Sequence, residues 1–342
     1  MINIGVIGYG YWGPNLVRNF AEVSGCRLHS VCDSRAERLN LVASRFPGVK
    51  VTTDPDELIN DPGVDAVVIA TPVSSHFELA HKALSAGKQT LVEKPLTISS
   101  EQAARLIELA ELRGLTLMVD HTFIYTGAVQ KLRQLVHAGA LGDVYYFDSE
   151  RINLGLFQHD VNVIWDLAVH DLSIMDYVLP MKPNAVSVTG MNHVNGAHEN
   201  IAYLTLFFPG QTIAHIHVNW LAPVKLRRTL IGGSKKMIVY DEMERSEPIK
   251  VYDKGIATQN GPDSVHRMLV DYRIGDMWAP HIDPTEALKV EAKHFLTCIE
   301  SGERPMTDGE MGLRVVRILE AASRSMAARG ELVELAPEEI FA

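Results

Sequence analysis

The stretch INIGVIGYGYWG at residues 2–13 decides the fold of the first part of the chain. An apolar run leads directly into Gly8-x-Gly10-x-x-Gly13, and an amphipathic segment follows. This order predicts a strand, a tight turn and a helix, which together are typical of a dinucleotide site. Gly8 permits the turn, Gly10 lets a pyrophosphate approach the backbone, and Gly13 lets the helix pack on the strand.

A second predicted strand, residues 27–32, ends at Asp33. A carboxylate there accepts hydrogen bonds from a ribose diol and repels a 2′-phosphate, so the sequence favours NAD over NADP. Arg35 argues in the opposite direction, because a nearby arginine accommodates that phosphate. The alternative is a glycine turn in an unrelated α/β protein, with Asp33 capping the next helix. The residues expected to bind the cofactor here are Gly8, Gly10, Tyr11, Trp12, Gly13, Asp33, Ser34 and Arg35.

The first 120 residues alternate predicted strands and helices, which indicates an α/β Rossmann domain with a doubly wound parallel sheet. The apolar run at 64–70 is typical of a strand that is buried on both faces. Strands are expected near 2–7, 27–32, 49–52, 65–70, 88–92 and 115–119, and helices near 13–24, 35–46, 74–86 and 99–113.

After residue 120 the pattern changes to that of an α+β domain with a large, mainly antiparallel sheet. The expected domains are therefore 1–120 and 121–342. Residues 242–282 are polar and aperiodic, which suggests an irregular excursion over the surface or the site. Strands are expected near 143–152, 185–193, 200–208, 211–220, 226–232 and 236–241, and helices near 127–138, 162–178, 284–301 and 309–329.

Composition excludes several classes of function. The net charge of −10 argues against a nucleic-acid or acidic-membrane partner. The three cysteines (Cys26, Cys32 and Cys298) lack metal-ligand spacing, so no metal site is expected and buried free thiols are favoured over a disulfide. With no signal peptide before the first strand and no apolar run long enough to span a bilayer, the cytoplasm is the expected compartment.

In a doubly wound sheet, ligands bind beyond the carboxyl ends of the strands. Thr71-Pro72, Glu93-Lys94-Pro95 and Asp120-His121 all follow predicted strands. The Lys94 ammonium would lie near the nicotinamide end of a cofactor, where it could stabilise negative charge on a substrate oxygen. The alternative is a loop lysine paired with Glu93.

Asp166 and His170 are four residues apart, a spacing that puts both on one face of a helix. A histidine titrates near neutral pH and can take the proton of an alcohol during its oxidation. Asp166 could orient the substrate or the ring. The alternative is an exposed ion pair on a helix.

Together, the N-terminal glycine turn, Ala70-Thr71-Pro72 with His76, Glu93-Lys94-Pro95-Leu96 and Asp166-x-x-x-His170 resemble the glucose–fructose oxidoreductase, inositol dehydrogenase and rhizopine catabolism (Gfo/Idh/MocA) family. The resemblance covers nearly the whole chain. It implies a Rossmann domain, a second domain with an open sheet, a nicotinamide cofactor, and oxidation of a secondary alcohol on a sugar or cyclitol.

The resemblance also implies roles for individual residues. Lys94 would contact the reacting hydroxyl, His170 would be the acid/base, and Asp166 would hold the substrate or tune the site. Pro95 would follow a cis peptide bond that aims Lys94. Many members have glycine where this chain has Ala168. The residues expected to line the cofactor are Thr71, Pro72, His76, Glu93 and Lys94.

Two further segments, 121–125 and 150–155, resemble family members that act on nucleotide-linked amino sugars. Those members oxidise the 3-hydroxyl of UDP-N-acetylglucosamine or its uronic acid before amination. The resemblance implies that Tyr125, Arg151 and Asn153 bind substrate. Arg151 could bind a phosphate or carboxylate, or form a surface ion pair with Glu150.

Other functions remain open within this resemblance. One alternative is a dehydrogenase of a free monosaccharide or inositol, and another is an NAD-using glycosidase or a ligand-sensing regulator without net redox turnover. The strand at 201–208 is apolar on both faces. It predicts either burial against a second subunit, in a homodimer or homotetramer, or a two-sided core within one chain.

Overall fold

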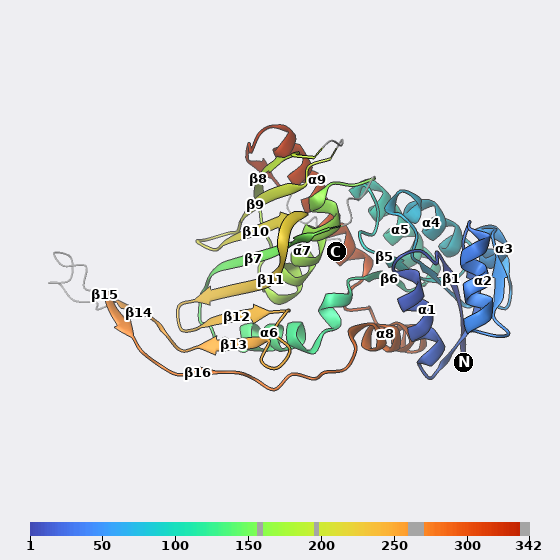
Figure 1. The fold of residues 1–342 in the computed structure, drawn as a ribbon, viewed down its shortest axis with the longest axis horizontal. Coiled ribbons are helices and arrows are strands. Elements are labelled where there is room, and N and C mark those ends of the chain that lie inside the picture. Colours follow the sequence, from blue (N-terminus) through green and yellow to red (C-terminus); the bar gives the residue numbers. More distant parts are fainter. Residues whose placement is uncertain (156–159, 195–197, 259–269, 336–342) are drawn as a thin grey trace. The chain divides into compact units, whose positions relative to one another are not determined.

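The computed structural model describes residues 1–155, 160–194, 198–258 and 270–335 (Figure 1). The chain forms two compact units. Unit 1 comprises residues 1–126 and 284–320, and unit 2 comprises 127–283 and 321–342. The segment 284–320 lies after the boundary expected at residue 120, yet it packs within unit 1.

Unit 1 contains a six-stranded parallel sheet in the order β3-β2-β1-β4-β5-β6, as the alternating pattern predicts. Its central strands are buried on both faces, and Val6 and Val68 are fully inaccessible. The strand order reverses between β1 and β4, and ligands bind at such a point in this class of sheet. The strands are β1 Ile2–Ile7, β2 Cys26–Cys32, β3 Lys50–Thr52, β4 Ala66–Ile69, β5 Gln89–Glu93 and β6 Leu117–Asp120.

The α-helices of unit 1 follow the expected positions, with one addition, and the short 3-10 helix η2 was also not expected. Helix α3 (Pro55–Asn60) was missed because six residues are too few to show helical periodicity. Its start is nevertheless encoded locally, since Asp54 caps the Asp56 amide and Pro55 occupies the first turn. The others are α1 Gly13–Glu22, α2 Ala36–Arg45, η1 Val73–Ser75, α4 His76–Ser85, α5 Ser100–Arg113, η2 Thr122–Tyr125, α8 Ala287–Ser301 and most of α9 Gly309–Ala327.

Helix α8 joins unit 1 through its contact with α1, and the two lie side by side in Figure 1. The rings of Phe20 and Phe295 meet edge to face with centroids 6.3 Å apart. Arg18 donates to both carboxylate oxygens of Glu286, at 2.5 and 3.1 Å. These contacts between distant residues therefore hold α8 against α1 in unit 1.

Unit 2 contains a nine-stranded sheet in the order β16-β13-β12-β11-β7-β10-β9-β8-β17. It is mostly antiparallel, but β7 pairs in parallel with β10, so it is not the simple meander expected. The segment 242–282, expected to be irregular, supplies four strands. The nine strands are β7 Val144–Leu154, β8 Ala185–Met191, β9 Ile201–Phe207, β10 Ile213–Asn219, β11 Leu221–Gly233, β12 Met237–Asp241, β13 Ile249–Tyr252, β16 Met277–Trp278 and β17 Val333–Glu334. The strands β14 Gly255–Thr258 and β15 Val270–Arg273 pair with each other in a separate two-stranded sheet.

Helices cover one face of this sheet: α6 (Gly127–His137), the π-helix η3 (Ile164–Ala168) and α7 (Val169–Val178). Along β9, Ala202, Leu204 and Leu206 are buried, whereas Tyr203 and Phe207 on the other face are 52% and 36% exposed. Among the residues that the structure describes, these two side chains on the second face are therefore only partly covered. No helix in the described segments is long and apolar enough to cross a membrane.

Candidate active site

The glycine turn lies at the reversal point of the unit 1 sheet, and its three glycines meet different constraints. Gly8 has a φ of +102°, and a Cβ there would lie 2.4 Å from the Ala70 carbonyl oxygen. A Cβ on Gly13 would lie 2.1 Å from the Gly8 carbonyl oxygen. Gly10 is different, since a Cβ there would approach only the Arg35 guanidinium, at 3.7 Å. These residues therefore leave open backbone beside the start of α1, which fits a dinucleotide pyrophosphate.

Asp33 is buried at the end of β2 and is held by the glycine turn. Its Oδ2 accepts from the Tyr9 amide at 2.7 Å, and its Oδ1 accepts from the Arg35 amide at 2.9 Å and from Arg35 Nε at 3.0 Å. Burial raises the pKa of Asp33, but the hydrogen bonds from Arg35 and Tyr9 outweigh burial and leave the pKa lowered. The carboxylate is thus ionised next to the turn, as ribose binding requires. Ser34 and Tyr11 are exposed beside it.

His76 was expected to line the cofactor, but its ring is buried beneath the loops that follow β4 and β5. Its Nε2 lies 2.8 Å from the Thr71 carbonyl oxygen and its Nδ1 lies 2.9 Å from that of Pro95. Burial lowers the pKa of His76, so the ring is neutral and donates to one of these carbonyls at a time. The ring thereby joins the Thr71 loop to the Lys94 loop.

Lys94 lies at the carboxyl end of β5, at the sheet edge that carries the glycine turn. Glu93 and Lys94 are both half-buried, and the Lys94–Pro95 peptide bond is cis, as expected. Position and partial exposure leave the Lys94 ammonium able to reach a bound molecule at this edge.

Trp12 and Asp120 form a contact that sequence reasoning missed. Trp12 Nε1 donates to Asp120 Oδ2 at 3.1 Å, which ties the glycine turn to the end of β6. Thr122 Oγ1 donates to Asp120 Oδ1. The only signal in the sequence was that Asp120 directly follows a predicted strand.

Tyr125 was expected to contact substrate, but the structure buries it in unit 1. Only 2% of the residue is exposed, and its hydroxyl lies 2.9 Å from Thr307 Oγ1. Thr307 belongs to residues 284–320, which pack within unit 1. Nothing local in the sequence could indicate that contact.

In unit 2, Asp166 lies in the π-helix η3 rather than in the continuous α-helix expected over 162–178. Such wide turns are frequent at functional sites. Trp220 Nε1 donates to Asp166 Oδ2 at 3.1 Å and so orients the carboxylate. A Cβ on Gly155 would lie 2.6 Å from the Trp220 ring, so a glycine is needed beside that ring.

His170 occupies the first turn of α7, and its position in that helix is distinctive. Every other residue of α7 is buried, while His170 is partly exposed. The helix therefore presents this imidazole while its remaining side chains pack inside unit 2.

Arg151 was expected to bind substrate or pair with Glu150, but it is buried below α7. Its Nε donates to Asp171 Oδ2 at 2.8 Å, and its Nη1 lies 3.3 Å from Glu242 Oε2. Burial lowers the pKa of Arg151, but Asp171 and Glu242 outweigh burial and raise it further above its usual value. The ion pair joins β7 to the residue that follows His170.

Asn153, the remaining substrate candidate, lies two residues further along β7. The register pairs Ile152 with Asn219, the last residue of β10, so Asn153 lies one residue beyond that pair. The Asn153 Oδ1 atom is buried and accepts no hydrogen bond from the part of unit 2 that the structure describes. Asn153 therefore lies on β7 beside the end of β10, and Trp220, the residue that follows β10, donates to Asp166.

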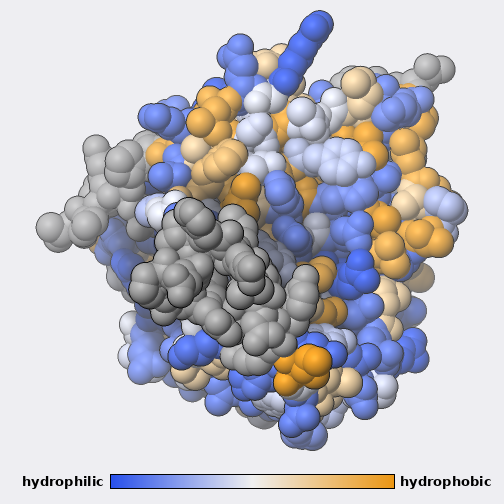
Figure 2. All heavy atoms as spheres, turned by 90° about the vertical axis from the view of Figure 1, so that its left-hand side faces the viewer, coloured by the Kyte–Doolittle hydropathy of each residue, from blue (hydrophilic) through white to orange (hydrophobic). Residues whose placement is uncertain are grey.

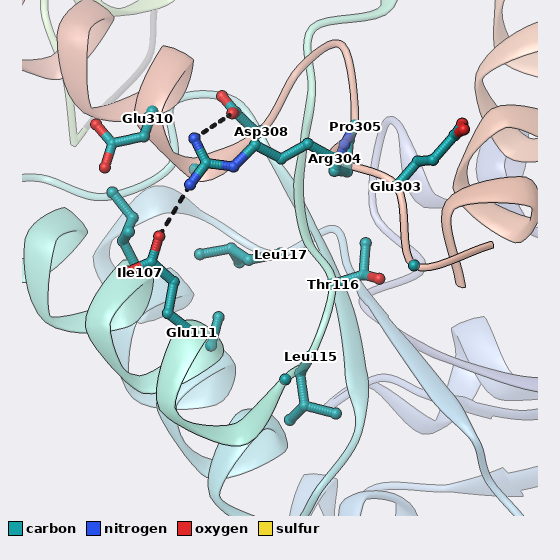
Figure 3. A pocket seen from close by; sticks show the side chains of 14 residues that line it. Ile107, Glu111, Leu115, Thr116, Leu117, Glu303, Arg304, Pro305, Asp308 and Glu310 are labelled. Atoms are coloured by element: carbon teal, nitrogen blue, oxygen red, sulfur yellow. Dashed lines mark hydrogen bonds and ion pairs between the residues drawn. The ribbon is translucent and has the colours of Figure 1, made fainter. Parts of the chain in front are cut away.

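A surface pocket of about 260 Å³ lies elsewhere in unit 1, between the end of α5 and residues 302–310 (Figure 3). It is near Leu117, at the amino end of β6, whereas the glycine turn lies at the carboxyl edge of the sheet. Arg304 spans its wall with contacts to Glu111 at 3.0 Å and Asp308 at 3.8 Å. It is not the cofactor site. Among the described residues, no cluster could hold a metal ion.

Comparison with known proteins agrees with this geometry. Residues 2–121 match the model of an oxidoreductase family with an NAD-binding Rossmann fold, and residues 129–239 match the GFO/IDH/MocA C-terminal domain. The chain belongs to the Gfo/Idh/MocA family of NAD(P)-dependent oxidoreductases.

Two relatives of known activity illustrate the range of the family. UDP-N-acetylglucosamine 3-dehydrogenase of Acidithiobacillus ferrooxidans is 31% identical, with 91% of this chain and 93% of the relative covered. The NAD-dependent scyllo-inositol 2-dehydrogenase of Bacillus subtilis is 26% identical, with 90% and 87% covered. A solved structure of the Acidithiobacillus enzyme superposes with a TM-score of 0.81 at 27% identity, with 96% of this chain and 98% of that chain covered.

The buried ion pair below α7 yields a stability prediction. Arg151→Met leaves Asp171 buried without its cation, so we expect the free energy of unfolding to fall by about 3–5 kcal/mol in urea titrations. Arg228→Met is the control, because that half-exposed arginine pairs with Glu150 and should contribute about 1 kcal/mol or less. Unchanged stability of Arg151→Met, with a raised KM, would instead favour the substrate role.

Proposed function

We propose that this protein oxidises the 3-hydroxyl of a UDP-linked N-acetyl sugar, or of the corresponding uronate, during amino-sugar biosynthesis. The observation that carries the proposal is the 31% identity over 91% of the chain to a UDP-N-acetylglucosamine 3-dehydrogenase. The partial exposure of Lys94 after β5 and of His170 in α7, and the orientation of Asp166 by Trp220, support it.

The proposed chemistry assigns one task to each side chain. A bound nicotinamide supplies the electron acceptor for oxidation of the alcohol. Lys94 donates a hydrogen bond to the reacting hydroxyl and stabilises the negative charge that develops on its oxygen. His170 accepts the hydroxyl proton at a ring nitrogen. Asp166, oriented by Trp220, holds the substrate, and Asn153 contributes to substrate binding.

NAD is the proposed cofactor in preference to NADP. The ionised Asp33 carboxylate at the end of β2 would repel a 2′-phosphate. The guanidinium of Arg35, which could attract that phosphate, is engaged by the same carboxylate.

Oxidation of a free sugar or inositol is the second candidate. It is favoured by the 26% identity to an inositol dehydrogenase over 90% of the chain. The two candidates differ in whether the protein binds a nucleotide diphosphate.

A substrate screen tests the proposal directly. Purified protein with NAD is offered UDP-N-acetylglucosamine, its uronate, free hexoses and inositols, and NADH formation is followed by absorbance. We expect turnover with a UDP-linked sugar and little with the free compounds. Turnover with an inositol alone would select the second candidate, and no NADH from any compound would favour a glycosidase or a ligand sensor.

Variants at the two proposed catalytic residues test the mechanism. Lys94→Ala and His170→Ala should each lower kcat by about 100-fold or more, because charge stabilisation and proton transfer each contribute on that order. NAD binding, measured by calorimetry, should remain nearly unchanged in both. Turnover close to that of the unaltered protein in either variant would end that assignment.

The cofactor preference has its own test. Asp33→Ala should raise the Kd for NAD, because the acceptor for the ribose hydroxyls is lost. It should also lower the Kd for NADP divided by the Kd for NAD, because the charge that repels the 2′-phosphate is lost. Asn40→Ala, at an exposed site in α2 to which no cofactor contact is assigned, serves as the control. An unchanged ratio would remove the ribose role of Asp33.

We also propose that the open sheet face mediates a homodimer or homotetramer. Tyr203 stacks on His217 with ring centroids 4.4 Å apart, and Phe207 lies further along the same face of β9. Viewed from the side shown in Figure 2, hydrophobic residues form separate patches among hydrophilic ones.

Tyr203→Glu should dissociate the oligomer in sedimentation velocity, whereas Leu112→Glu, at an exposed site in α5, should not. A monomeric unaltered protein at micromolar concentration would refute the proposal.

A further inference from the structure

A buried histidine in unit 1 lies between the loops that follow two neighbouring strands of the sheet. His76 is 1% exposed and is the first residue of α4. Its Nε2 lies 2.8 Å from the carbonyl oxygen of Thr71, after β4, and its Nδ1 lies 2.9 Å from that of Pro95, after β5. The chemistry proposed above assigns no task to this ring.

Helix α4 fixes the place from which the ring extends. The helix packs on both β4 and β5. His76, Ala80 and Ala83 follow the spacing of one helix face, and the two alanines are fully inaccessible. The face that carries His76 is therefore the one that packs inside unit 1, so the ring is held relative to the ends of both strands.

The ring can donate only one hydrogen bond, although both of its nitrogens face an acceptor. Burial lowers the pKa of His76 and the charge of Lys94 lowers it further, whereas hydrogen bonds to the backbone oppose these effects. A neutral imidazole has one N–H group and one lone pair. The contact that lacks the proton brings two acceptors together and contributes no stabilisation.

The two carbonyl groups differ in their need for that proton. The contact with Pro95 is buried, whereas the contact with Thr71 is only partly buried. A buried carbonyl group without a donor is costly, whereas a partly exposed one can accept a hydrogen bond from water. The arrangement therefore favours the proton on Nδ1, directed at Pro95.

We propose that His76 is a positioning residue that holds the loop of residues 94–99 by donating from Nδ1 to the Pro95 carbonyl oxygen. Pro95 directly follows Lys94, so a fixed Pro95 restricts the backbone from which the Lys94 side chain extends. His76 touches neither substrate nor cofactor and acts through Lys94. The part that concerns catalysis rests on the proposed function of Lys94, and the part that concerns the loop does not.

Asparagine and glutamine at position 76 each keep a donor, but at different distances from the backbone. The side-chain nitrogen of asparagine is bonded directly to Cγ, as Nδ1 of histidine is, whereas that of glutamine lies one atom further out, as Nε2 does. His76→Asn therefore keeps a donor toward Pro95, and His76→Gln keeps one toward Thr71. His76→Leu keeps neither.

Hydrogen exchange without substrate tests the contact itself, because the amides of residues 94–99 exchange through local opening of the loop. We expect exchange, followed by mass spectrometry, to be about fivefold faster in His76→Gln and His76→Leu, the size of one lost hydrogen bond. In His76→Asn it should stay within about twofold of the unaltered protein.

His81→Asn and His81→Gln, on the same helix, are the matched controls and should leave the exchange of residues 94–99 unchanged. Faster exchange in His76→Asn but not in His76→Gln would overturn the proposal, because the donor would then serve Thr71. Equal exchange in all three variants at position 76 would overturn it as well.

Turnover tests whether the contact positions Lys94 for the reaction. With NAD and the compound selected by the substrate screen, kcat should fall by about tenfold or more in His76→Gln and His76→Leu, because a displaced reacting group slows the reaction. In His76→Asn kcat should stay within about threefold. The Kd for NAD, from calorimetry, should change by less than about twofold in all three.

The two experiments separate this proposal from the proposed function. If the unaltered protein forms NADH but His76→Asn and His76→Gln have equal kcat values, the positioning role is refuted while the sugar chemistry stands. A role in packing alone would lower the Tm of both variants without separating their kcat values. If the unaltered protein forms no NADH with any compound, the exchange measurement still decides whether His76 holds the loop.

Discussion

The close approach of three backbone segments at the reversal point of the parallel sheet is the constraint on which the rest of unit 1 depends. Gly8 and Gly13 are required because a side-chain atom at either position would collide with a carbonyl oxygen at 2.4 Å or less. This approach brings β1, β4 and α1 together and leaves Gly10 open. Asp33 and Lys94 lie at the same edge of the sheet, because they follow the carboxyl ends of β2 and β5.

In unit 2, helix α7 is buried except for His170, whose side chain is partly exposed. The Arg151–Asp171 ion pair joins α7 to β7, and Trp220 orients Asp166 in the preceding π-helix. The polar groups near His170 are therefore held by buried partners. Such support gives His170 a defined orientation, which its proposed role in proton transfer requires.

Local patterns predicted most of the fold. The parallel strands, the glycine turn, Asp33 and the cis bond before Pro95 all follow from short stretches with a direct steric or periodic meaning. Helix α3 was too short for periodicity, and the strands in 242–282 have little alternation. The parallel pairing of β7 with β10 could not be foreseen because strand order depends on packing between distant segments.

The sequence by itself determined the cofactor turn, the class of the family and the candidate catalytic residues, because each depends on residue types at fixed local spacing. Only the tertiary structure decided which of the polar candidates are buried and bonded to other side chains. Tyr125 and Arg151 are buried because their partners arrive from distant parts of the chain, and spacing cannot reveal such partners. The same return of α8 to unit 1 places Phe295 against Phe20, because burial brings together groups that the sequence keeps far apart.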